Sequence, residues 1–399
     1  MHIKYVFSLL FFAQFLACSA EQPKKNLQVD KGKEIVTGAA RTEQYLPLLK
    51  DKRVALLVNQ TSMVGDAHLV DVLFAQKVNI KKIFAPEHGF RGSADAGEHV
   101  RDSVDSKTGI PIISLYGDKK KPSNEDLKNI DVVIFDVQDV GVRFYTFIST
   151  LQYLMEACAE NKKELIVLDR PNPNGWYIDG PVLKKEQQSF VGLAQIPVVH
   201  GLTIGEYALM TNGEKWLKNG ATCQLTVITC ENYTHTSRYS LPVKPSPNLP
   251  NDVAIYLYPS LCFFEGTDVS VARGTDYPFQ AFGSPKISIR NFSFTPRSVA
   301  GAKNPPHENR VCFGFDLRRM TTNAPGISLS YLLTAYKNHT DTSSFFLKNN
   351  FFEKLAGNTD LRKQVIEGKS EQEIRATWQA DILDYKKRRK QYLLYKDFE

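Results

Sequence analysis

Short runs of aliphatic and β-branched residues recur through the first half of the chain. They are RVALLVN (53–59), IKKIFA (80–85), IPIISLY (110–116), DVVIFDV (131–137) and ELIVLD (164–169). Two stretches with helical patterning, HLVDVLFAQK (68–77) and FISTLQYLMEACAEN (147–161), lie between or after these runs. Strands without alternating polar positions are typical of a parallel sheet that helices cover on both faces. The pattern therefore predicts an α/β fold, with a Rossmann-like parallel sheet domain over residues 45–240.

The chain beyond residue 240 has a different pattern, which predicts a smaller mixed α+β domain over residues 241–399. It begins with the proline-rich stretch LPVKPSPNLPND, a stiff crossover because proline fixes φ. A strand is expected at VCFGFDL (311–317). The closing helix should open at the capping box Ser370-x-x-Glu373. Its basic end, KKRRK (386–390), is expected to be solvated and to interact with the helix dipole.

The N-terminus has the pattern of a secretory signal. Residues 1–20 contain a short basic start, an apolar run too short to remain as a membrane span, and small residues around Cys18. The sequence FLAC resembles a bacterial lipobox, so lipidation at Cys18 and ordinary cleavage after Ala20 both stay open. Residues 21–44 are expected to form a polar tether. We therefore expect an exported protein, periplasmic or anchored to the membrane by a lipid.

Composition narrows the function classes further. The 399 residues are 42% hydrophobic and 23% charged, which is ordinary for a globular protein, and the net charge of +7 gives no argument for nucleic acid. The first strand is followed by VNQTSMVGD, with neither a G-x-G-x-x-G fingerprint nor a P-loop, so no nucleotide cofactor is predicted. Without Cys18, five cysteines remain; this odd number argues against a full disulfide framework, although Cys223 and Cys230 could pair.

Polar clusters follow three of the predicted strands. They are PEHG (86–89), QDVGVR (138–143) and DRPNPNG (169–175). Ligands of an open parallel sheet bind beyond the carboxyl ends of its strands, and these clusters fall at those ends. This convergence is the main residue-level indication of a site.

Glu87 is the candidate general acid. A carboxyl group at an apolar strand end can protonate a leaving oxygen, whereas the structural alternative is an ion pair with Arg91 or Arg143. His88 either orients Glu87 or is an ordinary loop histidine.

The second Glu-His pair, Glu98 and His99, is expected to be scaffolding. Together with Asp136 and Asp139 the Glu-His pairs raise the question of a metal. No His-x-x-x-His spacing occurs, so no metal is predicted.

The remaining polar residues have open alternatives. If the strand ends at Asp136, then Asp139 points the other way and one of the two is structural. Arg143 pairs with Asp139 or grips a substrate carboxylate with its planar fork. The amides of DRPNPNG suit sugar hydroxyls but are also plain turn chemistry. Thr203-x-x-Glu206 has the form of a capping box, which leaves His200 to face a ligand.

An ordered series of motifs covers the chain from about residue 45 onward. They are PEHGFRG, DVQDVGVRFYTF, LDRPNPNG…DGP, HGLTIGE, PSPNLP and YPSLCFFEGTDVSVARGTDYPF. In this order they resemble the exo-β-N-acetylmuramidases of glycoside hydrolase family 171, long known as a bacterial domain of unknown function. The chain departs from the family pattern at 222–240, where many members have a Trp-Arg pair.

The resemblance implies an enzyme without a cofactor that releases N-acetylmuramic acid from the non-reducing end of peptidoglycan fragments. The site would lie between the two domains, with Glu87 as acid and Asp136, Asp139 or the acetamido group of the substrate as the second group. The expected substrate-binding residues are His88, Arg143, Tyr145, Asp169, Arg170, Asn172, Asn174, His200, Asn248, Glu265 and Arg273. The alternatives are a non-catalytic surface lipoprotein that binds wall sugars and a metal-dependent hydrolase.

Overall fold

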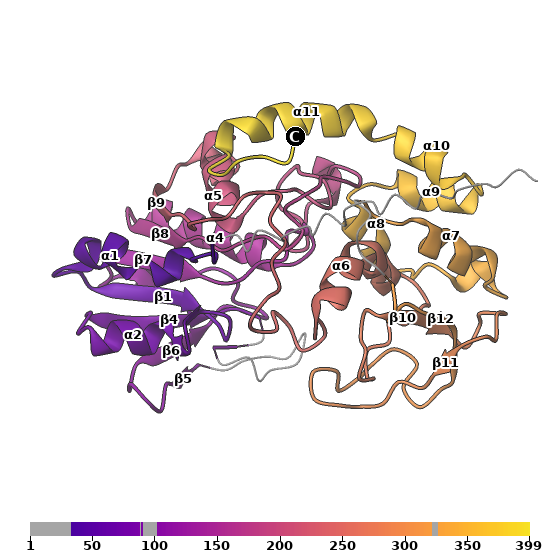
Figure 1. The fold of residues 1–399 in the computed structure, drawn as a ribbon, viewed down its shortest axis with the longest axis horizontal. Helices are drawn as coiled ribbons and strands as arrows, with labels where there is room; N and C mark the ends of the chain where they lie inside the picture. Colours follow the sequence, from indigo (N-terminus) through magenta and orange to yellow (C-terminus); the bar gives the residue numbers. More distant parts are fainter. Residues whose placement is uncertain (1–32, 88, 91–101, 321–325) are drawn as a thin grey trace, which may run out of the picture. The chain divides into compact units, whose positions relative to one another are not determined.

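A mostly parallel seven-stranded sheet forms the first half of the computed structural model, which describes residues 33–87, 89–90, 102–320 and 326–399. Its strand order is β5-β6-β4-β1-β7-β8-β9 (Figure 1). The strands are β1 (Val54–Val58), β4 (Ile80–Ala85), β5 (Ser103–Val104), β6 (Pro111–Ser114), β7 (Val132–Asp136), β8 (Glu164–Leu168) and β9 (Gln224–Ile228). Only β5 pairs antiparallel, and the other six follow the order 3-2-1-4-5-6 of a doubly wound sheet. The predicted Rossmann-like fold is confirmed.

Helices on both faces explain the unbroken apolar runs. Leu57 of β1 belongs to a core that also contains residues of α4 (Phe147–Glu160) and α5 (Ile204–Gly213). Its neighbours Leu56 and Val58 point into a second core, shared with α2 (Leu69–Ala75). Successive residues of a strand face opposite sides, so a sheet buried twice needs an apolar residue at every position. Short helices α1 (Thr42–Tyr45) and α3 (Asn124–Leu127) and the hairpin of β2 (Met63–Val64) and β3 (Ala67–His68) complete this part.

The second half combines helices with a small antiparallel sheet. Strands β10 (Ala281–Ser284), β12 (Cys312–Asp316) and β11 (Ser293–Phe294) pair in that order, which confirms the strand expected at 311–317. The helices are α6 (Asp252–Leu261), α7 (Ser330–Lys337), α8 (Phe351–Ala356), α9 (Asp360–Ile366), α10 (Glu371–Ala376) and α11 (Gln379–Arg389). Both predicted capping boxes are present, Thr203 with Glu206 at α5 and Ser370 with Glu373 at α10.

The basic end of α11 differs from its prediction. Arg389 is fully buried and donates to the carbonyl of Gly201 and to the carboxylate of Asp397. All five basic residues of KKRRK had been expected in solvent. One of them, Arg389, instead holds the last helix against the first half of the chain. Tyr385 supports the same contact, since its hydroxyl donates to the carbonyl of His200 at 2.7 Å. By their contacts, residues Ile35–Glu399 form one unit.

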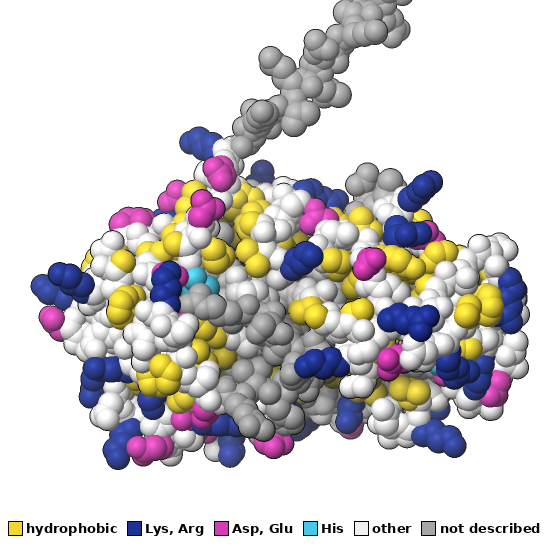
Figure 2. Space-filling view, turned by 90° about the horizontal axis from the view of Figure 1, so that it is seen from below, with side chains coloured by type: hydrophobic (Ala, Val, Ile, Leu, Met, Phe, Trp, Pro, Cys, Tyr) yellow, Lys and Arg dark blue, Asp and Glu magenta, His cyan; other side chains and the backbone are white. Residues whose placement is uncertain are grey.

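Cysteines and surface charge complete the description. The five cysteines of the described part of the chain are free and buried, so the pairing considered for Cys223 and Cys230 is wrong. A hydrogen bond to Cys223 and burial raise the pKa of the Cys158 thiol well above its ordinary value. On the face in Figure 2, the described basic and acidic side chains are interspersed, as the mild net charge implies. In the described ranges we find no helix with the length and apolar character to cross a bilayer.

Candidate active site

Glu87 lies in the turn that follows strand β4. The amide of Gly89, with φ of 76°, donates to the carbonyl of Pro86 at 3.0 Å and closes this turn. Two hydroxyl groups hold the half-buried carboxyl group. Tyr116 donates to Oε1 at 3.0 Å and Thr146 to Oε2 at 2.9 Å. Tyr116 follows β6 and Thr146 lies between β7 and α4, so the segments that follow β4, β6 and β7 meet at one carboxyl group.

The Glu87 carboxyl group borders a cavity of about 260 Å³. Aromatic rings form much of its wall, and Tyr258 packs edge-on against Phe144 and Phe279 at centroid distances of 5.4 and 5.0 Å. The described lining residues are Glu87, Tyr116, Phe144, Tyr145, Thr146, Phe190, Val191, Ser246, Asn248, Leu249, Tyr258, Glu265, Arg273, Phe279 and Phe351. We call this the Glu87 cavity. Apolar walls with a few convergent polar groups are typical of a small-ligand site.

A strained loop places Arg273 beside these rings, with its guanidinium carbon 5.1 Å from the centre of the Phe279 ring. Ala272 and Phe279 have φ of 59° and 56°, values that residues with a Cβ rarely adopt. Such conformations cluster at binding and catalytic sites, where the surrounding packing enforces them. They hold Arg273 and Phe279 in the wall of the cavity.

Glu265 belongs to a 3-10 turn, Cys262–Gly266, that packs against α8, and it pairs with Arg273. The following Gly266 packs so closely that an added Cβ would lie 2.5 Å from the Cα of Phe352. Arg273 approaches a single oxygen of Glu265, Oε1, with Nε at 2.8 Å and Nη2 at 2.6 Å. The Glu265 carboxylate and its cation therefore form one fixed unit in the cavity wall.

The predicted residues Tyr145 and Asn248 also line the cavity. The Tyr145 hydroxyl donates to the carbonyl of Pro245 at 2.7 Å, and the Asn248 amide donates to the carbonyl of Gly301 at 2.8 Å. Both bonds fix the proline-rich crossover, which supplies one side of the cavity.

Two family models match the chain, the N-terminal and C-terminal models of the exo-β-N-acetylmuramidase NamZ, over residues 54–253 and 256–395. The peptidoglycan β-N-acetylmuramidase NamZ of Bacillus subtilis is 37% identical over 416 residues, which cover 98% of each chain. The chain belongs to the exo-β-N-acetylmuramidase NamZ family. Two crystal structures of DUF1343 family proteins from Bacteroides fragilis are also similar. They are 49% and 30% identical, have TM-scores of 0.85 and 0.78, and each comparison covers 91% of this chain and 99% of the other.

Within this family fold, Asp136 and Arg170 do not line the Glu87 cavity. Both are buried, and the guanidinium of Arg170 binds the carboxylate with Nε to Oδ1 at 2.6 Å and Nη2 to Oδ2 at 2.9 Å. This paired geometry fixes the end of β7 to the loop after β8. The positions of Asp136 and Arg170 therefore do not fit the catalytic and substrate-binding roles predicted for them.

Asp139 and His200 form a second buried set away from the Glu87 cavity. Oδ2 of Asp139 accepts from the amide of Gly141 at 2.6 Å and lies 3.9 Å from Nε2 of His200. Burial raises the pKa of Asp139 to about 7 and lowers that of His200 to about 3. Neither residue is among those that line the Glu87 cavity, so their positions do not fit the roles predicted for them.

Arg143 ties the two halves of the chain together. Its buried guanidinium donates to the carbonyls of Pro181 and Ile196, and to that of Leu355 in α8, each at 2.8 Å. Burial lowers the pKa of Arg143 to about 9. Both sequence alternatives, an ion pair with Asp139 and a grip on a substrate carboxylate, are replaced by this structural role.

The DRPNPNG loop is also structural. Asp169 accepts bonds from Thr203, Gly205 and Tyr395, and burial raises its pKa to about 6. The Asn172 and Asn174 amides donate to backbone carbonyls, so the plain turn alternative fits them.

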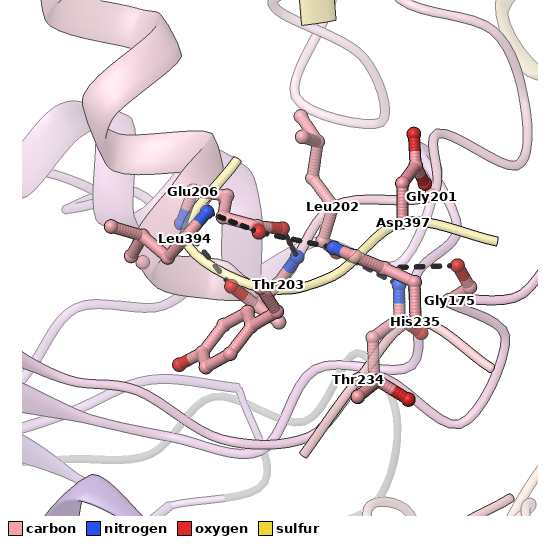
Figure 3. Close-up of polar contacts among 12 residues, drawn as sticks. Gly175, Gly201, Leu202, Thr203, Glu206, Thr234, His235, Leu394 and Asp397 are labelled. Carbon is pink, nitrogen blue, oxygen red and sulfur yellow. Dashed lines mark hydrogen bonds and ion pairs between the residues drawn. The ribbon is translucent and has the colours of Figure 1, made fainter. Parts of the chain in front are cut away.

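Glu206 does more than cap α5. Its Oε1 accepts from the amide of Leu394 at 2.9 Å and lies 3.0 Å from Nε2 of His235, whose Nδ1 lies 3.1 Å from the carbonyl of Gly175 (Figure 3). This buried network anchors the C-terminal tail and part of the divergent segment 222–240.

Some predicted residues lie outside the described part of the chain, namely His88, Glu98, His99 and the Glu87 partner Arg91. Within the described ranges, no group of three or more His, Cys, Asp or Glu residues could hold a metal ion.

Sequence reasoning missed the two hydroxyl donors to Glu87. Tyr116 ends the run IPIISLY, so its place beyond a strand end was a usable signal. Thr146 lies within DVQDVGVRFYTF beside more conspicuous charges. The rings of Tyr258, Phe279 and Phe351 come from distant segments, and nothing in the pattern distinguishes them from core residues.

Proposed function

We propose that this chain is an exo-acting glycoside hydrolase that releases N-acetylmuramic acid from the non-reducing end of peptidoglycan fragments, with Glu87 as general acid. The observation that carries the proposal is the Glu87 carboxyl group in the wall of a cavity lined by aromatic rings, in a chain of the NamZ family. In the reaction, Glu87 gives its proton to the glycosidic oxygen as the bond to C1 breaks. Water then adds to C1 and loses a proton, which restores the acid.

Arg273 supports the choice of muramic acid. The lactyl group of this sugar carries a carboxylate, and Arg273 is the one Lys or Arg among the described residues that line the Glu87 cavity. A planar guanidinium binds carboxylates well, and Nε and Nη2 already contact one oxygen of Glu265. The other two predicted cations, Arg143 and Arg170, are consumed by buried structural bonds.

The experiment is product analysis with the purified chain. Incubation with a disaccharide of N-acetylmuramic acid linked to N-acetylglucosamine should give both free sugars. A longer alternating saccharide with muramic acid at its non-reducing end should lose that one muramic acid and then resist the enzyme, because N-acetylglucosamine becomes the new end. Binding without any release would favour the non-catalytic alternative, and loss of activity after exhaustive chelation would favour the metal-dependent one.

We also propose that the chain is exported. The support is the signal pattern of residues 1–20, and peptidoglycan fragments occur outside the cytoplasm. Fractionation of a bacterial host that expresses the full chain and its Cys18→Ala variant tests the anchor. Wild type in the membrane fraction and variant in the soluble exported fraction would support a lipid on Cys18, whereas equal distribution would contradict it.

A further inference from the structure

A second, larger cavity of about 660 Å³ adjoins the Glu87 cavity. The two share three lining residues, Glu265, Arg273 and Phe351, so the Glu265–Arg273 pair lies at their junction. The larger cavity is built by residues 264–307, Leu347 and Phe351, all from the second half of the chain. Its rim includes the exposed residues Lys303, Asn304 and Pro306, so it leads toward solvent. We call it the outer cavity.

The junction is where a scissile bond would lie. Glycosidases that use two carboxyl groups place them on either side of the bond that breaks. Glu87 and Glu265 are the two carboxyl groups among the described residues of the smaller cavity, and Glu265 also lines the outer one. An exo-acting enzyme holds one sugar beyond this bond and must let the rest of the chain leave on the other side. The outer cavity provides that exit.

The walls of the outer cavity have the chemistry of a sugar site. Phe264, Val269 and Val271 supply apolar surface, against which the C–H face of a pyranose ring can pack. Hydroxyl and amide groups of a sugar need fixed polar partners as well.

Asp268 is such a fixed acceptor. Its Oδ2 lies 3.2 Å from Nε2 of the buried His339 and accepts from the hydroxyl of Ser284 at 3.3 Å. Nε2 of His307, another lining residue, lies 2.9 Å from the backbone carbonyl of Asp268. These contacts orient the carboxylate before a ligand arrives, while the side chain remains partly exposed.

We propose that the outer cavity binds the amino sugar on the leaving side of the scissile bond, an N-acetylglucosamine unit of the fragment that remains. This rests on the proposed function and adds a binding subsite to it. The muramic acid that is to be released then occupies the Glu87 cavity. The glycosidic bond between the two sugars lies at the border of the cavities, beside the Glu265–Arg273 pair.

Filling the outer cavity tests the assignment. The variants Ala302→Trp and Leu347→Trp place a large ring in it from two half-buried lining positions. Ala380→Trp, at an exposed site of α11, is the matched control. For each protein, kcat/KM is measured with the muramic acid–glucosamine disaccharide and with an aryl muramide whose leaving group is a single nitrophenol. We expect the ratio of disaccharide to aryl turnover to fall at least tenfold in both filled variants and to stay unchanged in the control.

Other results would overturn the assignment. An equal fall for both substrates would place the outer cavity outside the leaving-sugar path. A fall confined to substrates with a peptide on the lactyl group would assign the cavity to that peptide. If unmodified protein hydrolyses neither muramide, the proposed function itself fails. Binding of free N-acetylglucosamine, followed by calorimetry, gives a readout that is independent of turnover and should weaken at least tenfold in Ala302→Trp.

Discussion

Hydroxyl donors distinguish Glu87 from Asp136, the other predicted catalytic carboxyl group at a strand end. A hydroxyl group can donate to a carboxylate and accept from a carboxylic acid, so Tyr116 and Thr146 suit both protonation states of Glu87. The guanidinium that holds Asp136 can only donate, so it suits the ionised form alone. A general acid must alternate between both forms, which the hydroxyl partners of Glu87 allow and the paired guanidinium on Asp136 does not.

Thr146 is predicted to act as a positioning residue. Thr146→Val removes the hydroxyl and keeps the shape, so the carboxyl group of Glu87 loses one of two orienting bonds. We expect kcat for the disaccharide to fall about tenfold, since small misplacements of a reacting group are costly, with KM little changed. Thr146→Ser restores the hydroxyl and should restore kcat. Equal losses in both variants would show that packing, and not the hydrogen bond, matters.

Asp139 is predicted to make stability depend on pH. Its pKa of about 7 in the folded chain exceeds the unfolded value near 3.9, so the folded state binds the extra proton between these values. Stability from this group is full below pH 4 and is lost as pH rises through 7. The pKa of His200 is lowered, so its contribution to stability has the opposite dependence on pH: it is full above about pH 6.5 and is lost as pH falls below that value.

The variant Asp139→Asn isolates the first effect. The free energy of unfolding of the variant minus that of wild type should increase between pH 4 and pH 7.5, by on the order of 4 kcal/mol. His200 contributes to both proteins and largely cancels in this difference. Urea titrations at several pH values provide the measurement, and a difference that does not change with pH would contradict the burial of an ionisable Asp139.

At the scale of elements, the C-terminal tail holds the carboxyl ends of the sheet. The Tyr395 hydroxyl donates to Asp169 at 2.5 Å and accepts from the amide of Cys230 at 2.9 Å. The Leu394 amide donates to Glu206 within the buried network of Figure 3. The last residues of the whole chain thus supply hydrogen-bond partners to polar groups that are buried in its first half. The first half therefore depends on the C-terminal tail.

Tyr395→Phe tests this dependence. Removal of the hydroxyl leaves a buried carboxylate oxygen and a buried amide short of a partner, so we expect a loss of about 1–3 kcal/mol in the free energy of unfolding. Tyr392 lies on the same tail and donates to Glu214 at 2.9 Å near the surface. The control Tyr392→Phe should cost less than about 0.5 kcal/mol. Equal effects in urea titrations would show that the tail contributes only surface contacts.

The elements themselves were largely predictable. Five of the sheet strands appear as largely apolar runs, although β4 contains Lys81 and Lys82, because both faces of the sheet are covered. This signal needs no knowledge of the partner helices. Strand β9 was missed because it is an edge strand whose run QLTVI contains polar positions. The end of α11 was misjudged since no local pattern shows that Arg389 meets Gly201.

At the scale of the whole molecule, the candidate site was predictable only in part. Glu87, Glu265 and Arg273 line the Glu87 cavity, and strand ends and a glycine-rich charged stretch gave them local signatures in the sequence. Asp136, Arg143 and Arg170 have the same residue types and similar positions, yet they are consumed by bonds to distant segments. Whether a charged side chain faces a ligand or a buried partner depends on long-range packing, which residue order does not reveal.

The central claim is that Glu87 gives a proton to the leaving oxygen. The most direct measurement compares Glu87→Gln with wild type on two muramides, one with a sugar leaving group and one with a dinitrophenol, which departs without a proton. The account predicts that the variant stays folded, loses about 10²–10⁴-fold in kcat/KM on the sugar substrate and less than about tenfold on the activated one. Equal losses on both substrates, or no loss on the first, would contradict it.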